Sequence, residues 1–276
     1  MTPTSCMIPL HLLPTRTAGA AENMALDFLL LQRYPEPAPP RFRHYEWRAA
    51  ACTFGFSQKI EFVRAHLPSV AKAREGTPVQ EAFDLCRRPT GGGIVDHRTD
   101  WTYALVLPRG HELYEARATQ SYRIVHECLT AALVALGQPA AVNLACAPVE
   151  RVAPNALVER VAPNALSGAA SCGQAAPPLG ICFQRAELYD VVNTANGAKI
   201  AGAAQKRNKH GLLFQGSIEK NSVGPVVWEN FAEHFTTALA VALGATAAAT
   251  PWPELNEDEV SGLIEQYSSP EWLEYR

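Results

Sequence analysis

Residues 82–107, AFDLCRRPTGGGIVDHRTDWTYALVL, contain a glycine-rich loop between two strand-like segments. The first segment, Ala82–Arg88, leads into Pro89 and three successive glycines, and the second, Trp101–Leu107, ends at Pro108. Because glycines have no side chains, the backbone can approach a bound ligand and offer its N–H groups to an oxyanion. The loop therefore indicates a small-ligand site, although a flexible hairpin tip with two solvated arginines would have the same pattern.

The sequence around this loop predicts strands and helices in irregular order. Other strands are expected at residues 41–47, 52–56, 181–193, 199–202 and 211–217, with a hairpin turn at Asn196-Gly197. Helices are expected at residues 21–33, 113–136 with Gly137 as the C-cap, 228–242, and after the N-cap Asn256. This order favours an α+β fold, with a mixed or antiparallel central sheet and surrounding helices, over a doubly wound parallel sheet.

No linker separates two domains within the 276 residues, so we expect a single domain over 1–276 with its core at about 20–245. Residues 149–157 repeat identically as residues 158–166, a unit far too short for a solenoid. Each copy contains a proline, and a tract of small residues follows. We therefore predict an exposed loop that tolerates insertion at residues 146–180.

The overall composition excludes several classes of function. A formal net charge of -3 gives no basic surface for nucleic acid. The seven cysteines are scattered and lack any C-x-x-C pair, which argues against a disulfide framework and a zinc site. The N-terminal residues lack the pattern of a signal peptide, and no apolar run is long enough to span a membrane. We expect a cytoplasmic protein without a metal.

Two further motifs contain reactive side chains. Lys199 lies among small residues in Gly197-Ala-Lys-Ile-Ala-Gly202, where a lysine can reach into a pocket or can simply be exposed on a strand. Cys182 lies in Gly180-Ile-Cys-Phe183, and a lone cysteine between apolar neighbours is most often an inert buried thiol. Neither motif alone distinguishes these alternatives.

Four motifs in this order resemble the lipoate–protein ligase A-type and octanoyltransferase family. They are Ala21-Glu-Asn-Met-Ala-Leu-Asp27, Arg87-Arg-Pro-Thr-Gly-Gly-Gly93 with His97, Cys182-Phe183 before Leu188-Tyr-Asp190, and Lys199-Ile-Ala-Gly-Ala-Ala-Gln205. The resemblance covers about residues 20–220, with a weaker echo in the C-terminal Pro270-Glu-Trp-Leu-Glu-Tyr-Arg276. It implies the catalytic-domain fold of biotin and lipoate protein ligases, with the glycine loop and Lys199 facing one acyl pocket.

Within this family, the chain is most similar to the cysteine-dependent octanoyltransferases, because Cys182 precedes the motif lysine by 17 residues. The resemblance implies transfer of an octanoyl group from acyl carrier protein to a lysine of a lipoyl-carrier domain. The acceptor would be glycine-cleavage H protein or a 2-oxoacid dehydrogenase E2 subunit, and no cofactor would be needed. Catalytic roles would fall to Cys182 and Lys199, and substrate-binding roles to Arg87, Arg88, Gly91, Gly92, Gly93, His97 and Gly202.

Three other functions remain open at this point. An ATP-dependent lipoate–protein ligase would need MgATP and commonly has an additional C-terminal domain. An amidotransferase that moves octanoyl between two lipoyl carrier proteins would use the same cysteine and lysine. A non-catalytic acyl-binding or carrier-binding paralogue is the third, and the presence of both Lys199 and Cys182 argues against it.

Overall fold

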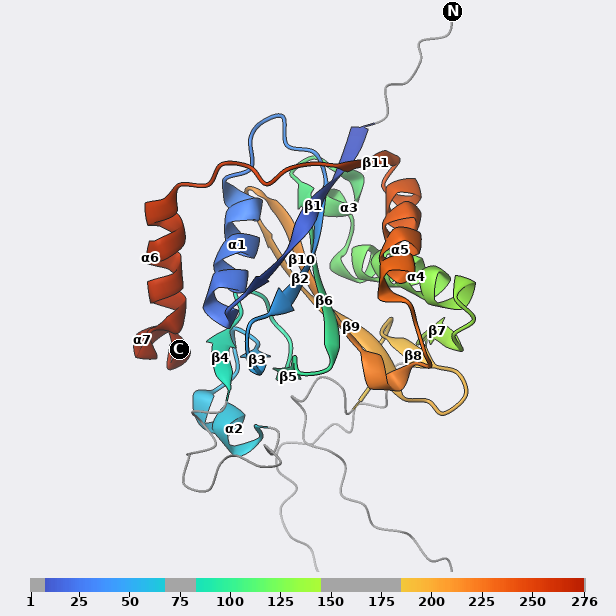
Figure 1. Ribbon diagram of the computed structural model, residues 1–276, viewed down its shortest axis with the longest axis horizontal. Helices are drawn as coiled ribbons and strands as arrows, with labels where there is room; N and C mark the ends of the chain where they lie inside the picture. The colour runs from blue at the N-terminus through green and yellow to red at the C-terminus, as the bar shows by residue number, and fades with distance from the viewer. Residues whose placement is uncertain (1–7, 68–82, 145–184, 276) are drawn as a thin grey trace, which may run out of the picture.

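A computed structural model describes residues 8–67, 83–144 and 185–275 of the chain (Figure 1). The predicted nucleophile Cys182 and the predicted insertion loop at residues 146–180 lie outside these ranges. Within them, no helix is long and apolar enough to cross a membrane.

Strands and helices alternate irregularly along the described residues. The strands are β1 (Ile8–Ala18), β2 (Arg41–Trp47), β3 (Ala51–Phe54), β4 (Asp84–Arg87), β5 (Val95–Asp96), β6 (Asp100–Pro108), β7 (Ala140–Val142), β8 (Val191–Asn193), β9 (Lys199–Asn208), β10 (Gly211–Glu219) and β11 (Ala245–Ala249). The helices are α1 (Ala20–Gln32), α2 (Ile60–Ala65), α3 (Glu112–Glu115), α4 (Ala118–Ala135), α5 (Trp228–Ala242), α6 (Glu257–Ser268), α7 (Pro270–Leu273) and the short 3-10 helix η2 (Lys220–Ser222).

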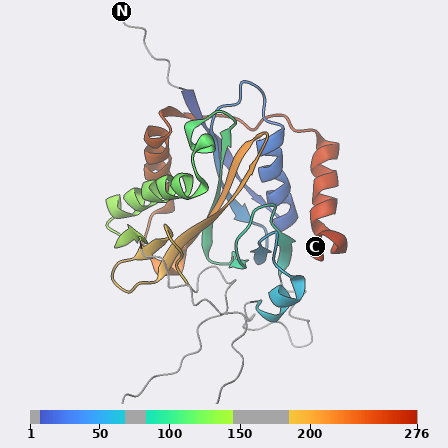
Figure 2. The same ribbon diagram turned by 180° about the vertical axis from the view of Figure 1, so that it is seen from behind.

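The larger sheet contains eight of the described strands, in the order β11-β1-β2-β6-β10-β9-β8-β7. β1 pairs in parallel with β11 and β2, whereas every neighbouring pair from β2 to β7 is antiparallel. The hairpin of β9 and β10 crosses the centre of the sheet, as Figure 2 shows from behind. The predicted α+β fold with a mixed sheet is confirmed.

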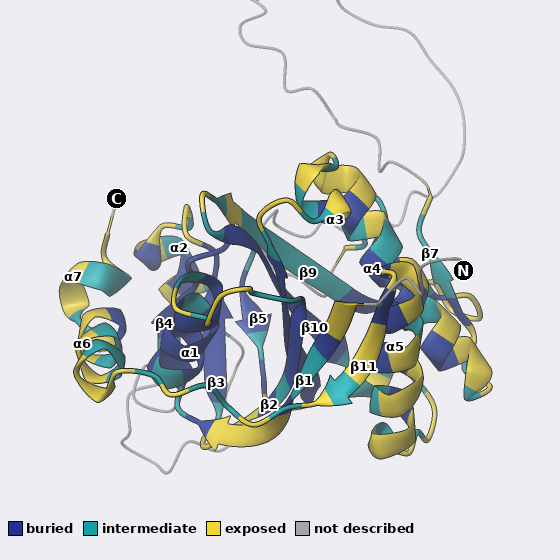
Figure 3. Ribbon diagram, turned by 90° about the horizontal axis from the view of Figure 1, so that it is seen from above, coloured by how far each residue is buried: buried dark blue, intermediate teal, exposed yellow. Residues whose placement is uncertain are grey.

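Helices cover both faces of this sheet (Figures 1 and 3). One face packs against α4 and α5, where Tyr103 and Leu105 of β6 join Leu129 and Phe235 in one apolar cluster. The opposite face packs against α1, with α6 outside α1, and receives Ala104 and Val106 of β6. The alternation along β6 follows from the two-residue period of a strand. Because both faces are covered, β6 is apolar along most of its length.

A second sheet of three strands, β4-β3-β5, lies near one end of the larger sheet. Cys52 and Phe54 of β3, with Ile94 just before β5, cluster with Ile60 and Val63 of α2. The glycine loop connects β4 to β5 and thus leaves this small sheet toward the larger one. The pocket described below lies between the two.

Several predicted elements are confirmed. β2 has the predicted bounds, and α1, β3, β4, β6, β10 and α5 lie within two residues of theirs. Gly137 has a positive φ of 75°, and the Gln138 N–H donates to Leu133 O, which together form a Schellman C-cap after α4. The Asn256 side chain accepts from the Glu259 N–H at 2.9 Å as the N-cap of α6.

Other predictions were wrong in their bounds. The helix predicted at 113–136 is divided into α3 and α4, because Ala116 and Arg117 adopt extended backbone conformations. Among the described residues of the strand predicted at 181–193, only Val191–Asn193 are extended. β9 continues to Asn208, six residues beyond the predicted end.

β1 was not predicted, although it lies inside the larger sheet between β11 and β2. Its two prolines, Pro9 and Pro14, are typical of turns and edge strands, because proline lacks an N–H for the ladder. The pairing with β2 shifts register between Leu13 and Arg16, which accommodates Pro14. β1 and α6 both extend the packed structure beyond the expected core at 20–245.

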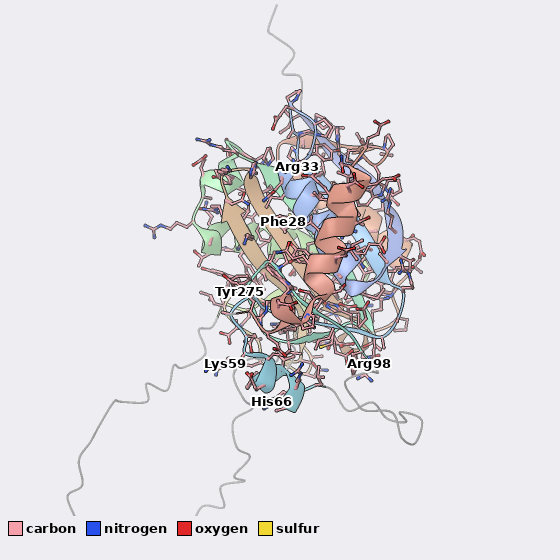
Figure 4. The ribbon with its side chains drawn as sticks, turned by 90° about the vertical axis from the view of Figure 1, so that its left-hand side faces the viewer. Phe28, Arg33, Lys59, His66, Arg98 and Tyr275 are labelled. Atoms are coloured by element: carbon pink, nitrogen blue, oxygen red, sulfur yellow. The ribbon has the colours of Figure 1, made fainter. Side chains whose placement is uncertain are left out.

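The C-terminal segment packs against the outside of α1. Figure 4 views this side, with α6 beside α1, Phe28 labelled on α1 and Arg33 labelled just after its end. Arg33 forms an ion pair with Glu259 at 2.8 Å, and the ring of Phe28 meets Tyr267 edge-on. The last helix, α7, thereby reaches the small sheet.

Candidate functional site

A pocket lies between the α1-facing side of the larger sheet and the glycine loop. The empty volume, which includes open solvent at its mouth, is about 500 Å³. Five of the predicted site residues line it, namely Arg88, Gly92, His97, Lys199 and Gly202. The other lining residues are Met24, Tyr45, Thr53, Val95, Thr102, Ala203, Ala204, Gln215, Gly216 and Ser217.

Arg88 holds the glycine loop in shape from within. Its Nη2 donates to the carbonyls of Gly91 and Gly93 at 3.0 and 2.8 Å, and its Nη1 donates to Thr53 Oγ1 at 2.8 Å. Gly92, between the two carbonyls, has φ +90°, and a Cβ there would lie 3.1 Å from Arg88 Nη2. The loop therefore needs glycine at this position both for conformation and for space.

Arg87, the neighbouring predicted residue, points away from the pocket. Its guanidinium donates to the carbonyls of Gln58, Leu273 and Trp272 at 2.8, 2.6 and 2.9 Å, and to that of Phe56. Because consecutive strand residues face opposite sides, Arg87 and Arg88 separate at the end of β4. Arg87 thus joins α7 to the turn after β3, and the structure does not bring it to the pocket.

The turn after β3 also supports the glycine loop. The Phe56 N–H donates to Thr90 O at 2.8 Å. A Cβ on Gly55 would lie 2.0 Å from Gly92 O, so the two backbones touch where no side chain can fit. Arg87 donates to carbonyls of this same turn, so it supports the glycine loop from the side away from the pocket.

His97 is buried in the pocket wall and links the small sheet to β6. Its Nδ1 lies 2.6 Å from Asp100 Oδ2, and its Nε2 lies 2.7 Å from Thr53 Oγ1. Burial by itself would raise the pKa of Asp100, but the His97 charge and hydrogen bonds from His97, Ser217 and Thr102 lower it below its ordinary value. Asp100 therefore remains a carboxylate that orients the imidazole.

Lys199 is buried at the start of β9 and forms an ion pair with a buried aspartate. Its Nζ lies 2.7 Å from Asp190 Oδ2, and the two side chains are 7% and 1% exposed. Breaking such a pair by removing one partner typically costs about 3–5 kcal/mol, since the other charge remains buried. The ammonium is thus held at a defined place on the pocket wall.

Gly202 leaves room for that lysine. A Cβ on Gly202 would lie 2.8 Å from both Cε and Nζ of Lys199 and 3.2 Å from Asp190 Oδ1. The lysine side chain therefore lies over the glycine three residues later on the same strand. This packing is a physical reason for the Lys199-Ile-Ala-Gly202 spacing.

A buried polar network lies beneath the pocket. Gln215 accepts from Thr90 Oγ1 at 2.6 Å and donates to Asp27 Oδ2 at 2.6 Å, and Arg43 donates to Asp27 Oδ1 at 2.6 Å. Burial raises the pKa of Asp27 despite the opposing charge of Arg43. The network joins the Ala21–Asp27 motif of α1 to the residue before the glycine loop, so the first two motifs meet in one site.

None of the cysteines that the structure describes lines the pocket. Cys52, Cys86 and Cys128 are buried. Burial raises the pKa of the Cys86 thiol well above its ordinary value and that of Cys128 to about 11, which disfavours the thiolate. Cys86, which directly precedes Arg87, faces the core near Tyr267. Cys6, Cys146, Cys172 and Cys182 lie outside the described residues.

The sequence did not assign a site role to Asp190, Thr53 or Tyr122. Asp190 ends the Leu188-Tyr-Asp190 motif, so its place before a strand leading to Lys199 was a usable signal. Tyr122 lies within the helix predicted at residues 113–136, and its hydroxyl contact with Asp190 depends on tertiary packing. Within the described ranges, no group of three or more His, Cys, Asp or Glu side chains could hold a metal.

The fold is similar to that of solved lipoate ligases. A lipoate-protein ligase A bound with ATP superimposes with a TM-score of 0.65 at 16% identity, covering 97% of this chain and 99% of that one. A bipartite lipoate protein ligase from Thermoplasma acidophilum gives a TM-score of 0.65 at 16% identity, covering 98% of each chain. At this identity the likeness shows the fold alone.

Curated relatives named octanoyltransferase LipM are similar in sequence. The Bacillus cereus protein is 29% identical over 199 residues, which cover 72% of this chain and 60% of that protein. The Bacillus subtilis protein is 30% identical over 202 residues, covering 73% and 62%. The chain thus spans about three-fifths of the length of these relatives. The Symbiobacterium thermophilum protein is 26% identical, covering 95% of this chain and 97% of that protein.

The model of one protein family, the lipoyl protein ligase A/B catalytic domain, matches residues 19–156. This range is half of the chain and includes the first two sequence motifs. The chain belongs to the lipoyl protein ligase A/B catalytic domain family.

Proposed function

We propose that this protein is an octanoyltransferase that moves an octanoyl group from acyl carrier protein to a lysine of a lipoyl-carrier domain. The observation that carries the proposal is the buried Lys199 ammonium on the wall of a pocket closed by the glycine loop. A positive group or hydrogen-bond donor, fixed where negative charge develops on the carbonyl oxygen, accelerates acyl transfer. The relatives named octanoyltransferase LipM support this choice of reaction.

The pocket is suited to a short acyl chain. Its apolar wall residues include Met24, Val95, Ala203 and Ala204. An eight-carbon chain gains several kcal/mol on burial, at roughly 0.8 kcal/mol per CH₂. The same apolar walls would select chain length, because a longer chain must leave part of its surface in water.

The proposed mechanism uses Cys182 as the nucleophile, as the family resemblance implies. The Cys182 thiolate attacks the donor thioester carbonyl, and the carrier leaves as its thiolate when the acyl-enzyme thioester forms. The acceptor lysine amine then attacks the acyl-enzyme, loses a proton and releases the Cys182 thiolate as the amide forms. The first exchange is nearly isoenergetic and the second is downhill, so ATP is not needed. Lys199 would favour the thiolate and stabilise each tetrahedral oxyanion.

The test is mass spectrometry of the protein after incubation with octanoyl-acyl carrier protein alone. We expect one octanoyl mass that hydroxylamine removes, mapped to the peptide containing Cys182. The Cys182→Ala variant should lose both the adduct and the transfer to a lipoyl domain. Cys86→Ala is the matched control and should keep both, since Cys86 faces the core.

The same assay separates the competing functions. Lipoylation with pyrophosphate release from lipoate, MgATP and a lipoyl domain, without an adduct, would instead identify an ATP-dependent ligase. Transfer from octanoylated glycine-cleavage H protein but not from acyl carrier protein would identify an amidotransferase. Binding of octanoyl-acyl carrier protein without any transfer would identify a non-catalytic paralogue.

A further inference from the structure

We propose that Tyr122 and His126, one turn apart on α4, are positioning residues that fix the Lys199 ammonium through the Tyr189–Asp190 segment. The inference rests on the proposed function, in which Lys199 stabilises the oxyanion. Neither residue lies in one of the four sequence motifs.

Tyr122 connects the lysine's carboxylate partner to the strand that bears the lysine. Its hydroxyl donates to Asp190 Oδ1 at 2.6 Å and accepts from the Ala203 N–H at 3.0 Å. Burial, followed by the nearby charge of Asp190, raises the pKa of Tyr122 well above its ordinary value. The hydroxyl therefore stays protonated and keeps donating to the carboxylate.

Asp190 has a separate donor for its other oxygen. Oδ2, the atom that contacts Lys199 Nζ, also accepts from the Glu187 N–H at 2.6 Å. With Oδ1 held by Tyr122 and Oδ2 held by the backbone, the carboxylate cannot rotate without losing a hydrogen bond. A lysine side chain has many rotamers, so a rigid partner is what limits its ammonium to one position.

His126 holds the backbone on which Asp190 is mounted. Its Nδ1 lies 2.6 Å from Tyr189 O, and since a carbonyl only accepts, Nδ1 carries the proton. Burial lowers the pKa of His126 to about 4, so the ring is neutral at pH 7. The ring also meets Tyr122 edge-on, with centroids 4.2 Å apart. One turn of α4 thus contacts both the backbone and the side chain of the segment.

The segment adopts a conformation that needs such support. Tyr189 has φ 67°, the left-handed region that residues other than glycine rarely occupy. Its N–H donates to Asn143 O at 2.7 Å, and the Asn143 N–H donates to Asp190 O at 2.7 Å. Contacts from α4 and from the residue after β7 therefore hold the turn that directs Asp190 toward Lys199.

The first test compares Tyr122→Phe with Tyr114→Phe. Both changes remove one hydroxyl that bonds to the backbone of β9, but Tyr114 bonds to Asn208 O, far from Lys199 along the strand. We expect Tyr122→Phe to lower kcat for octanoyl transfer about tenfold with KM nearly unchanged, the loss typical of one hydrogen bond to a charged group. Tyr114→Phe should leave both constants at wild-type values.

The second test measures Lys199 itself, without the acyl-transfer reaction. Trace labelling with acetic anhydride, read by peptide mass spectrometry, reports how exposed and how basic each lysine amine is. Asp190→Asn should increase the labelling of Lys199 several-fold relative to Lys206, since it removes the ion pair. Tyr122→Phe should also increase the labelling of Lys199, and Tyr114→Phe should leave it unchanged.

The third test uses His126→Asn and His126→Leu. Asparagine can place an N–H near the position of Nδ1, whereas leucine cannot. We expect His126→Asn to keep the wild-type kcat and Lys199 labelling, and His126→Leu to show the changes seen with Tyr122→Phe. A merely structural role would instead lower stability without this rescue pattern.

The outcomes distinguish the two proposals. Unchanged Lys199 labelling and kcat in both Tyr122→Phe and His126→Leu would overturn the positioning role. If wild type transfers no octanoyl group but the labelling changes as expected, the positioning role stands and the octanoyltransferase proposal fails. Equal effects of Tyr114→Phe and Tyr122→Phe would also overturn the inference, because the response would not be specific to the Asp190 side.

Discussion

The two walls of the pocket are built in different ways. In the glycine-loop wall, Arg88 bonds to carbonyls only three and five residues later in the chain. In the lysine wall, Lys199 depends on Asp190, nine residues earlier, and on Tyr122, 68 residues before Asp190. The loop wall keeps its shape through bonds within the loop, with added support from Thr53 and the turn after β3. The lysine wall forms only when α4 packs on the sheet.

The two walls therefore differ in which substitutions they tolerate. The loop wall depends on backbone conformation and on one guanidinium, so its sensitive positions are Gly92 and Arg88. The lysine wall depends on the placement of two opposite charges in a buried environment. We therefore expect changes in the loop wall to affect donor binding, and changes in the lysine wall to affect turnover.

The largest expected effect comes from the lysine wall. Lys199→Ala should reduce kcat by roughly 10²–10³-fold, the loss typical of one oxyanion-stabilising group. Lys206→Ala is the control on the same strand. Lys206 Nζ contacts Pro89 O at 3.3 Å and is not part of the Lys199–Asp190 ion pair. Steady-state rates of octanoyl transfer measure both. A near wild-type rate in Lys199→Ala would remove this residue from the mechanism.

Alanine variants of the neighbours Arg88 and Arg87 compare the loop wall with the contacts that support it from outside. Arg88→Ala should raise KM for the donor tenfold or more, at roughly 1.5–3 kcal/mol per charged hydrogen bond. Arg87→Ala should instead lower the free energy of unfolding by several kcal/mol on the same estimate, since its bonds go to α7 and the turn after β3. Transfer kinetics and urea unfolding distinguish them, and an unchanged KM in Arg88→Ala would contradict the assignment.

Stability at acidic pH gives an independent measure of the lysine wall. The pKa of His126 is about 4 in the folded protein and 6.5 in an unfolded chain. Between these values only the unfolded chain gains a proton on this residue, so the folded state loses stability as pH falls from 7 to 5. Wild type should lose roughly 2 kcal/mol more than His126→Asn over this interval. Urea unfolding at both pH values checks it, and equal losses would show that His126 is not buried neutral.

The smallest expected effect is a difference in donor affinity between alanine variants of two adjacent glycines. Gly92→Ala places a Cβ at φ +90° and 3.1 Å from Arg88 Nη2, whereas a Cβ at Gly91 meets no atom within 4 Å. A left-handed residue other than glycine costs about 1–2 kcal/mol, so donor affinity should fall about tenfold in Gly92→Ala. Gly91→Ala should bind as wild type does. A larger residue such as valine at position 92 should block donor binding, and unchanged binding would contradict the assigned place of Gly92.

The sequence determined the parts of the protein that depend on local pattern. Apolar periodicity and cap residues located α1, β2, β6, α5 and the start of α6, because hydrogen bonding and side-chain period act over a few residues. The glycine loop was also visible, since Arg88 and Gly92 hold it through near neighbours. The sequence did not place β1 in the sheet, because its prolines have a local preference that the pairing with β2 and β11 overrides.

Only the tertiary structure decided how these parts meet. Cys86 faces the core, where it packs near Tyr267. Arg87 bonds to α7 and Arg88 bonds to Thr53 in the pocket wall, although the two are adjacent in one motif. The ion-pair partner of Lys199 could not be predicted from the sequence. A buried charge pairs with the opposite charge that the fold brings close, and here that is Asp190 at 2.7 Å.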